Sequence, residues 1–123
     1  MGTITCAVIQ LRSTEDVTNN LATAKHLIRQ AAEAGAACIA TPENTAFLRT
    51  NPTTRPPIQP LTGAIVSELR ELADELGIFL LVGSVQEQIP NEATRYANTS
   101  VLIDGRETGA PIAAVYRLSL IHI

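Results

Sequence analysis

The sequence is poor in aromatic residues and in charge, and these shortages narrow the choice of fold and of function. Only 3% of the 123 residues are aromatic and none is Trp, so a hydrophobic core has to be built from Ala, Val, Ile and Leu. Charged residues make up 17% of the chain, the net charge is −3, and there is no basic run. A nucleic-acid partner is therefore not expected, because such surfaces need clustered Lys and Arg.

Long apolar runs are also missing. No stretch approaches the roughly 20 apolar residues that a membrane-spanning helix requires, so no membrane partner is expected. The start, "MGTITCAVIQ", lacks the basic region and long apolar region of a secretory signal. Cysteine is scarce, and Cys6 and Cys38 both lie inside apolar runs, where unpaired cysteines are usually small core hydrophobes. These features predict a reduced, cytoplasmic protein.

The apolar residues that are present, 46% of the chain, predict one globular domain. The first segment, "TITCAVIQL", predicts a strand buried on both faces. A helix with an apolar stripe from Val17 to Ala31 follows, with Ser13 or Thr14 as its N-cap and Gly35 just after its end. The segment "AACIAT" predicts a second buried strand.

The second half of the chain predicts one more helix and three more strands. The proline-rich stretch "RTNPTTRPPIQP" predicts a surface loop. Thr62 is a candidate N-cap for a helix that ends at Gly77. The strands are "IFLLVGSV", "YANTSVLI" and "APIAAVY", and the last two predict a hairpin through "DGRETG". The order β-α-β-α-β-β-β predicts an α/β fold in which helices cover a sheet.

Glu43 is the strongest candidate for chemistry on position alone. It follows Pro42, at the point where the second buried strand ends, and reactive groups in α/β sheets gather beyond the carboxyl ends of the strands. A carboxylate at such a mouth is expected to be partly desolvated, which suits a general base. The alternative from position alone is a solvated loop glutamate.

Other candidate residues favour structural roles. His26 lies beside the apolar stripe of the first helix without a partner and is expected to be solvated. Ser84 in "VGSV" lacks the G-x-S-x-G pattern of serine hydrolases. Asn98 opens the fourth strand and is interpreted as a turn residue. No G-x-G-x-x-G stretch and no metal-ligand spacing is present, so neither a cofactor nor a metal is predicted.

Five short stretches of the sequence, taken together, resemble a known protein family. They are, in order, "AVIQL", "ATPEN", "GIFLLVGS", "NTSVLIDG" and "AAVYR". As an ordered set, ending at Arg117, they resemble the nitrilase superfamily of carbon–nitrogen hydrolases, and most of all its small amidases of the deaminated glutathione amidase and omega-amidase type. The resemblance implies the N-terminal part of an α-β-β-α sandwich and a parent protein that is a homo-oligomer.

The resemblance also implies a machinery of glutamate, lysine and cysteine, without a cofactor. In the family a cysteine thiolate attacks an amide or nitrile carbon, a lysine stabilises the developing charge, and a glutamate moves the protons. Glu43, in its Pro-Glu motif, matches the glutamate. The lysine normally follows Tyr-Arg, where this sequence has Leu118. The nucleophilic cysteine belongs beyond residue 123, and neither Cys6 nor Cys38 matches it.

We therefore expect residues 3–117 to be a partial carbon–nitrogen hydrolase domain and residues 118–123, "LSLIHI", to be a non-native tail. A natural truncation or frameshift is the alternative, and the coding DNA distinguishes the two. The chain itself is expected to be inactive toward its small-molecule amide substrate. Without the later strands of the sandwich, one face of the sheet is expected to be exposed and apolar, with an unpaired edge.

Two other functions fit parts of the pattern. A non-catalytic α/β interaction module, or pseudoenzyme, would keep the half-sandwich and bind a stable partner. A small flavodoxin-like or nucleotide-binding domain would need a phosphate-cradling glycine loop after a strand. The only candidate for that loop, around Gly83, has too few glycines.

Overall fold

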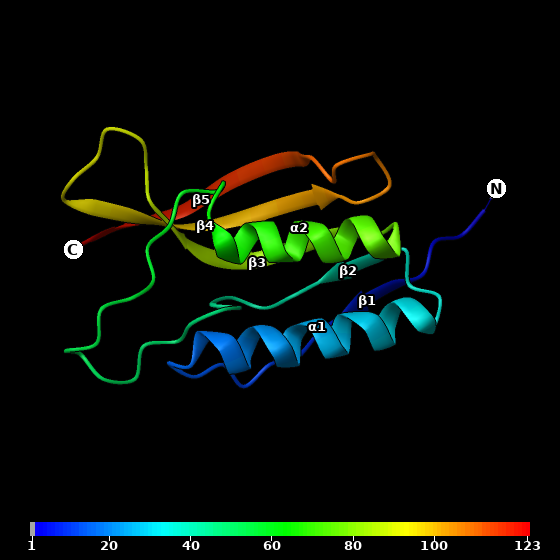
Figure 1. The fold of residues 1–123 in the computed structure, drawn as a ribbon, viewed down its shortest axis with the longest axis horizontal. Helices are drawn as coiled ribbons and strands as arrows, with labels where there is room; N and C mark the ends of the chain where they lie inside the picture. Colours follow the sequence, from blue (N-terminus) through cyan, green and yellow to red (C-terminus); the bar gives the residue numbers. More distant parts are fainter. Residues whose placement is uncertain (1) are drawn as a thin grey trace.

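The computed structural model describes residues 2–123, which form a five-stranded sheet and two helices (Figure 1). In chain order the elements are β1 (Cys6–Val8), α1 (Val17–Glu33), β2 (Cys38–Ala40), α2 (Ala64–Leu76), β3 (Phe79–Glu87), β4 (Arg95–Asp104) and β5 (Ile112–His122). This is the mixed α/β fold and the element order that the sequence predicts. The strands lie in the sheet in sequence order, with β1, β2 and β3 parallel and β4 and β5 antiparallel.

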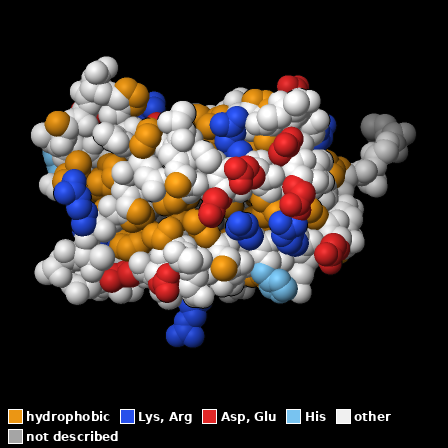
Figure 2. All heavy atoms as spheres, in the orientation of Figure 1, with side chains coloured by type: hydrophobic (Ala, Val, Ile, Leu, Met, Phe, Trp, Pro, Cys, Tyr) orange, Lys and Arg blue, Asp and Glu red, His pale blue; other side chains and the backbone are white. Residues whose placement is uncertain are grey.

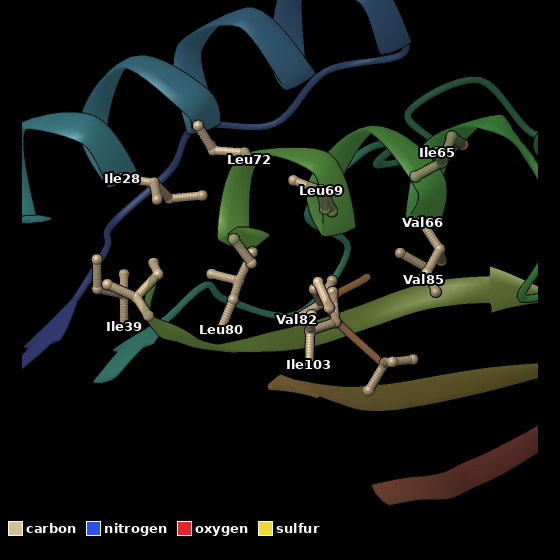
Figure 3. Packing of buried hydrophobic residues seen from close by; sticks show 14 of the residues in the cluster. Ile28, Ile39, Ile65, Val66, Leu69, Leu72, Leu80, Val82, Val85 and Ile103 are labelled. Carbon is tan, nitrogen blue, oxygen red and sulfur yellow. The ribbon is translucent and has the colours of Figure 1, made fainter. Parts of the chain in front are cut away.

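The hydrophobic core lies between the two helices and one face of the sheet (Figure 3). Leu80 and Val82 alternate along β3, and both are fully buried, as is Ile103 on β4. Ile28 of α1 and Leu69 of α2 meet them from the helical side. Every member of this cluster is Ala, Val, Ile or Leu, as the composition requires. The buried residues of each helix lie three or four positions apart and share one helix face, which confirms the predicted stripes.

The two helix starts differ from the predicted ones. Asp16, and not Ser13 or Thr14, is the N-cap of α1, because its carboxylate accepts a hydrogen bond from the backbone N–H of Asn19 at 3.0 Å. The N-cap of α2 is Gly63, without a side-chain bond, in place of Thr62.

The helix ends agree with the prediction. Gly35 follows α1 with φ +98°, and Gly77 ends α2 with φ +63°. Both glycines have the positive φ that favours glycine after a helix.

Strand β1 is shorter and far more exposed than predicted. It has three residues, lies at an edge of the sheet, and pairs only with β2. Val8 is 86% exposed, and Cys6 is exposed as well. The expectation that this strand is buried on both faces is wrong, because the two helices cover a single face of the sheet.

The second face of the sheet is open among residues 2–123. Val8 on β1 and Leu81 on β3 are exposed on it, and Tyr116 on β5 is 68% exposed. Figure 2 shows instead the side of the molecule on which the helices lie, where acidic and basic side chains are interspersed with hydrophobic ones. The structure therefore shows the apolar exposure and the free sheet edges that the sequence leads us to expect. In the described part of the chain, neither helix is long and apolar enough to cross a membrane.

Strand β5 is longer than the predicted "APIAAVY". It runs to His122, and its last residues pair with the start of β4, with His122 opposite Arg95 and Ile121 opposite Tyr96 (Figure 1). Residues 119–122 thus pair with β4 beyond a bulge at Leu118. That residues 118–123 are a non-native tail stays a prediction.

Candidate active site

Glu43 lies in a turn just beyond the carboxyl end of β2, where the sequence places it. Its Oε1 accepts a hydrogen bond from Nδ2 of Asn98 on β4 at 2.8 Å. The side chain is exposed, so the expected partial desolvation of Glu43 is wrong. The reason is the open face of the sheet, which leaves one side of the turn uncovered. The carboxylate is nevertheless held at the mouth of the sheet by a specific donor.

The residue after Glu43 fixes the turn against β3. Asn44 has a left-handed backbone with φ +56°, which Asn tolerates better than most residues. Its N–H donates to Oγ of Ser84 at 2.8 Å, and its Oδ1 accepts from Nε2 of Gln86 at 3.1 Å. Ser84 is fully buried and serves as a structural acceptor. Two bonds to one strand therefore determine the direction in which Glu43 leaves the turn.

The backbone of β3 comes very close to the backbone of Thr41 and Pro42, and this approach is possible because residue 83 is a glycine. A Cβ on Gly83 would lie 1.9 Å from the carbonyl oxygen of Thr41. Strand β3 also bulges here, since three steps from Val82 to Val85 oppose two steps on β4. The hydroxyls of Thr41 and Thr45 lie 2.8 Å apart in the buried interior of the turn. This packing explains why a glycine occupies position 83 within β3.

Glu43 and Asn98 line a cleft of about 260 Å³. Its other polar or charged lining residues are Asn44, Arg49, Gln86 and Ser119, and its less polar ones are Phe47, Leu48, Pro56, Tyr96 and Ile121. The cleft thus gathers the turn after β2, the proline-rich loop and three strands that are distant in the sequence.

Glu15 anchors the loop that forms one wall of this cleft. Its Oε1 accepts hydrogen bonds from the backbone N–H groups of Thr50 at 2.8 Å and Asn51 at 2.6 Å. Its Oε2 accepts from the hydroxyl of Thr54 at 3.0 Å. The backbone bond from Asn51, followed by that from Thr50, lowers the pKa of Glu15 from its usual value. Glu15, which precedes α1 in the chain, therefore holds the loop that carries Thr50, Asn51 and Thr54.

An ion pair joins β3 to β5 beside the site. Glu87 is 3% exposed, and Arg117 donates to both of its oxygens, at 2.9 and 2.8 Å. The Thr99 hydroxyl donates to the same carboxylate at 2.8 Å. Hydrogen bonding to Glu87 raises the pKa of Arg117. Leu118, at the position expected for the lysine, is exposed and has no Cα partner, because Arg117 pairs with Thr99 while Ser119 pairs with Asn98.

The remaining candidates lie outside this cleft. Cys6 and Cys38 face each other on β1 and β2, exposed and half-buried respectively, so the prediction of two core cysteines is wrong. Burial raises the pKa of the Cys38 thiol, and Cys6 beside it raises the pKa further. His26 is exposed on α1, as predicted. Among residues 2–123, no three His, Cys, Asp or Glu side chains form a group that could hold a metal ion.

Asn98 is the site residue that sequence reasoning missed. Its side chain is 8% exposed and contacts the catalytic candidate, although the sequence suggested only a turn residue. The one available signal was a polar amide inside the apolar strand "YANTSVLI". A buried amide needs a partner, and here the partner is Glu43.

The model of one protein family, described as carbon–nitrogen hydrolase, matches residues 5–121 of this chain. The chain belongs to the carbon–nitrogen hydrolase family. The match includes the turn with Glu43, strand β4 with Asn98 and most of β5. It extends past Arg117, where the five-stretch resemblance ends.

Curated relatives of this carbon–nitrogen hydrolase chain are amidases. Human deaminated glutathione amidase is 34% identical over 114 residues, which cover 90% of this chain and 34% of the relative. The bovine protein of the same name is 39% identical over 83 residues, which cover 67% of this chain and 25% of the relative. The chain thus spans about a third or less of the length of these relatives.

A solved structure agrees with the fold. The Caenorhabditis elegans NitFhit protein superposes with a TM-score of 0.75 at 25% identity, over 94% of this chain and 28% of that one. The carbon–nitrogen hydrolase fold of residues 2–123 is therefore supported by structure as well as by sequence.

Proposed function

We propose that this chain is the glutamate-bearing part of an amidase-type hydrolase that acts on a small carboxylated amide, with Glu43 as general base. The observation that carries the proposal is the Glu43 carboxylate, held by Asn98 at the mouth of a cleft of about 260 Å³. A general base has to reach the proton that it removes. The exposed position of Glu43 leaves its second oxygen accessible to a substrate or to water.

The proposed reaction follows the family's division of labour. Glu43 removes the proton of a cysteine thiol, and the thiolate attacks the amide carbon. The resulting tetrahedral intermediate, stabilised by a lysine, expels ammonia or an amine when Glu43 returns the proton to nitrogen. Glu43 then takes a proton from water, the hydroxide attacks the thioester, and the carboxylic acid and thiol are released.

The residues of this chain support the glutamate step alone. Lys25, its single lysine, lies on α1 and does not line the cleft with Glu43. Cys6 and Cys38 do not line it either, and the raised pKa of Cys38 disfavours its thiolate. The proposal is therefore that these 123 residues do not hydrolyse amides by themselves.

A carboxylated substrate is supported by Arg49 and by the curated relatives. The human relative is named for deaminated glutathione, a carboxylated amide, and this chain is proposed to share that substrate class. Arg49 is exposed and lines the cleft together with Glu43. Its guanidinium suits a carboxylate at the far end of the substrate.

The function is tested with a chimera that joins residues 5–117 of this chain to the remaining part of the human relative. We expect the chimera to release ammonia from succinamic acid, and the 123-residue chain to release none above buffer. We expect Arg49→Met to raise the KM of the chimera about tenfold, with kcat retained, because it binds the distant carboxylate. Ammonia release from the 123-residue chain that Glu43→Gln abolishes would overturn the proposal of an inactive chain.

We also propose that the protein is cytoplasmic and that its parent is a homo-oligomer. The free thiols of Cys6 and Cys38 support a reducing compartment. Cell fractionation of the tagged parent protein, followed by sedimentation of the purified protein, tests both statements.

A further inference from the structure

The two cysteines of the chain are far apart in the sequence and lie side by side in the sheet. Cys6 on β1 is the Cα partner of Cys38 on β2, and the two strands are parallel. Neighbouring strands are about 4.8 Å apart, so paired residues bring their side chains together. The spacing of the cysteines in the sequence does not reveal this pair, because the register of β1 on β2 creates it.

Both thiols lie on the open face of the sheet. Ala7, which follows Cys6, packs against the hydrophobic core, and Ile39, which follows Cys38, is fully buried in it. Since successive side chains of a strand point to opposite faces, Cys6 and Cys38 point away from the helices. Cys6 is exposed and Cys38 is half-buried, so solvent reaches the pair from the side of Cys6.

The two thiols also affect each other. Burial raises the pKa of the Cys38 thiol, and Cys6 raises it further through its charge and through a side-chain hydrogen bond. These effects require that the side chains approach each other, as the register of the two strands indicates. Both cysteines are free, so both sulfur atoms can act as ligands.

A pair of thiols restricts the metal ion that it binds. Structural zinc takes four ligands, and iron–sulfur clusters are held by four cysteines. Among residues 2–123, no three His, Cys, Asp or Glu side chains form such a group. Soft thiolate ligands also select Cu(I), and this ion is satisfied by two thiolates in a linear arrangement. Two opposed thiols therefore suit Cu(I) better than the ions that need more ligands.

We propose that Cys6 and Cys38 form a dithiol site on the open face of the sheet and bind one Cu(I) ion between their sulfur atoms. The ion replaces the two thiol protons, which go to water, and it is neither oxidised nor reduced. Phe79, the Cα partner of Cys38 on β3, gives the site an apolar neighbour. The site is separate from the proposed amidase chemistry, because neither cysteine lines the cleft with Glu43.

The inference is tested by anaerobic titration of the reduced 123-residue chain with Cu(I), in competition with bicinchoninate, a chelator whose Cu(I) complex is coloured. We expect the chain to withdraw one equivalent of Cu(I) from the chelator. We expect Cys6→Ser to weaken this binding at least about 100-fold, because the second of two linked ligands binds at a high effective concentration.

A variant that keeps two thiols and changes their register is the matched control. Cys6→Ser/Val8→Cys moves the exposed thiol two positions along β1, about 6.6 Å, so that it lies opposite Ala40. We expect this variant to bind Cu(I) at least about tenfold more weakly than the unaltered chain. Residues 6 and 8 are both exposed on an edge strand, so the fold is expected to be retained, which circular dichroism checks.

Equal affinity of the register variant and the unaltered chain would overturn the inference, because the opposition of Cys6 and Cys38 would then not matter. Failure of the unaltered chain to withdraw Cu(I) from bicinchoninate would also overturn it. So would one Cu(I) per two chains with a doubled mass in analytical ultracentrifugation, because the ion would then join Cys6 of two copies. None of these results bears on hydrolysis by the chimera, which tests Glu43.

Discussion

Asn98 and Glu43 are 55 residues apart in the chain and are joined by a hydrogen bond of 2.8 Å from amide to carboxylate. The bond connects the middle of an antiparallel strand to a turn that follows a parallel one. Because Asn44 is bonded to Ser84 and Gln86, the same turn is also held to β3. The carboxylate is therefore positioned by two strands, although its side chain is exposed.

Gly83→Ala should distort the turn that carries Glu43. The new Cβ would lie 1.9 Å from the carbonyl oxygen of Thr41, and backbone atoms have to move to relieve this contact. We expect a loss of about 2–3 kcal/mol in the free energy of unfolding, measured by urea denaturation. Gly2→Ala is the control, because its Cβ meets nothing within 4 Å. Equal stability of the two variants would show that the approach of β3 to this turn is not tight.

Glu15 should make the wall of the cleft sensitive to acid. Its pKa is lowered in the folded chain, so its stabilising effect is present above the unfolded pKa and is lost as the pH falls through the lower folded value. We expect the amide resonances of Thr50 and Asn51 to move only at a pH below the ordinary pKa of a glutamate, because the pKa of Glu15 is lowered. Glu15→Gln should remove that movement, and Glu68→Gln, an exposed change on α2, should not. Movement of both resonances near pH 6 would contradict the assignment.

Removing Arg117 should leave the Glu87 carboxylate buried without its cation. We expect Arg117→Met to lower the free energy of unfolding by about 2 kcal/mol, less than for a fully buried pair because Arg117 is 45% exposed. The double variant Glu87→Gln/Arg117→Met should regain most of this loss, since Gln has no charge and still accepts from Thr99. Additive losses in the double variant would show that the pair is not coupled.

The open face of the sheet should make the chain self-associate. Val8 and Tyr116 expose 86% and 68% of their surface, one on each edge strand. We expect Tyr116→Lys to lower the weight-average mass in analytical ultracentrifugation, because edge lysines oppose strand pairing. Thr18→Lys adds the same charge on α1 and should leave the mass unchanged. A chain that stays monomeric at about 100 µM would contradict the expected association.

The element order and the position of Glu43 could be predicted from the sequence because both depend on local patterns. Helix stripes, the glycines after each helix and the apolar strands have fixed spacings, and the Pro-Glu motif marks the strand end. The exposure of β1 could not be predicted, because an apolar run looks the same whether one face of the sheet is covered or both. The same limit applies to Cys6, which lies in that run.

The partners of the site depend on contacts between distant segments. Ser13 and Thr14 are the caps that the sequence predicts, and only the three-dimensional turn shows that Asp16 reaches the helix. Asn98 lies opposite Gln86 on the neighbouring strand, and this register brings its amide to Glu43. One sequence does not specify that register, because the bulge after Val82 shifts it.

The central claim is that Glu43 is the general base, and succinamic acid hydrolysis by the chimera tests it most directly. We predict that Glu43→Gln lowers kcat at least about 100-fold without loss of folded protein, because general-base catalysis contributes about that much or more. Glu71→Gln, on the exposed surface of α2, should leave kcat unchanged. A Glu43→Gln chimera that turns over succinamic acid at the unaltered rate would contradict the claim.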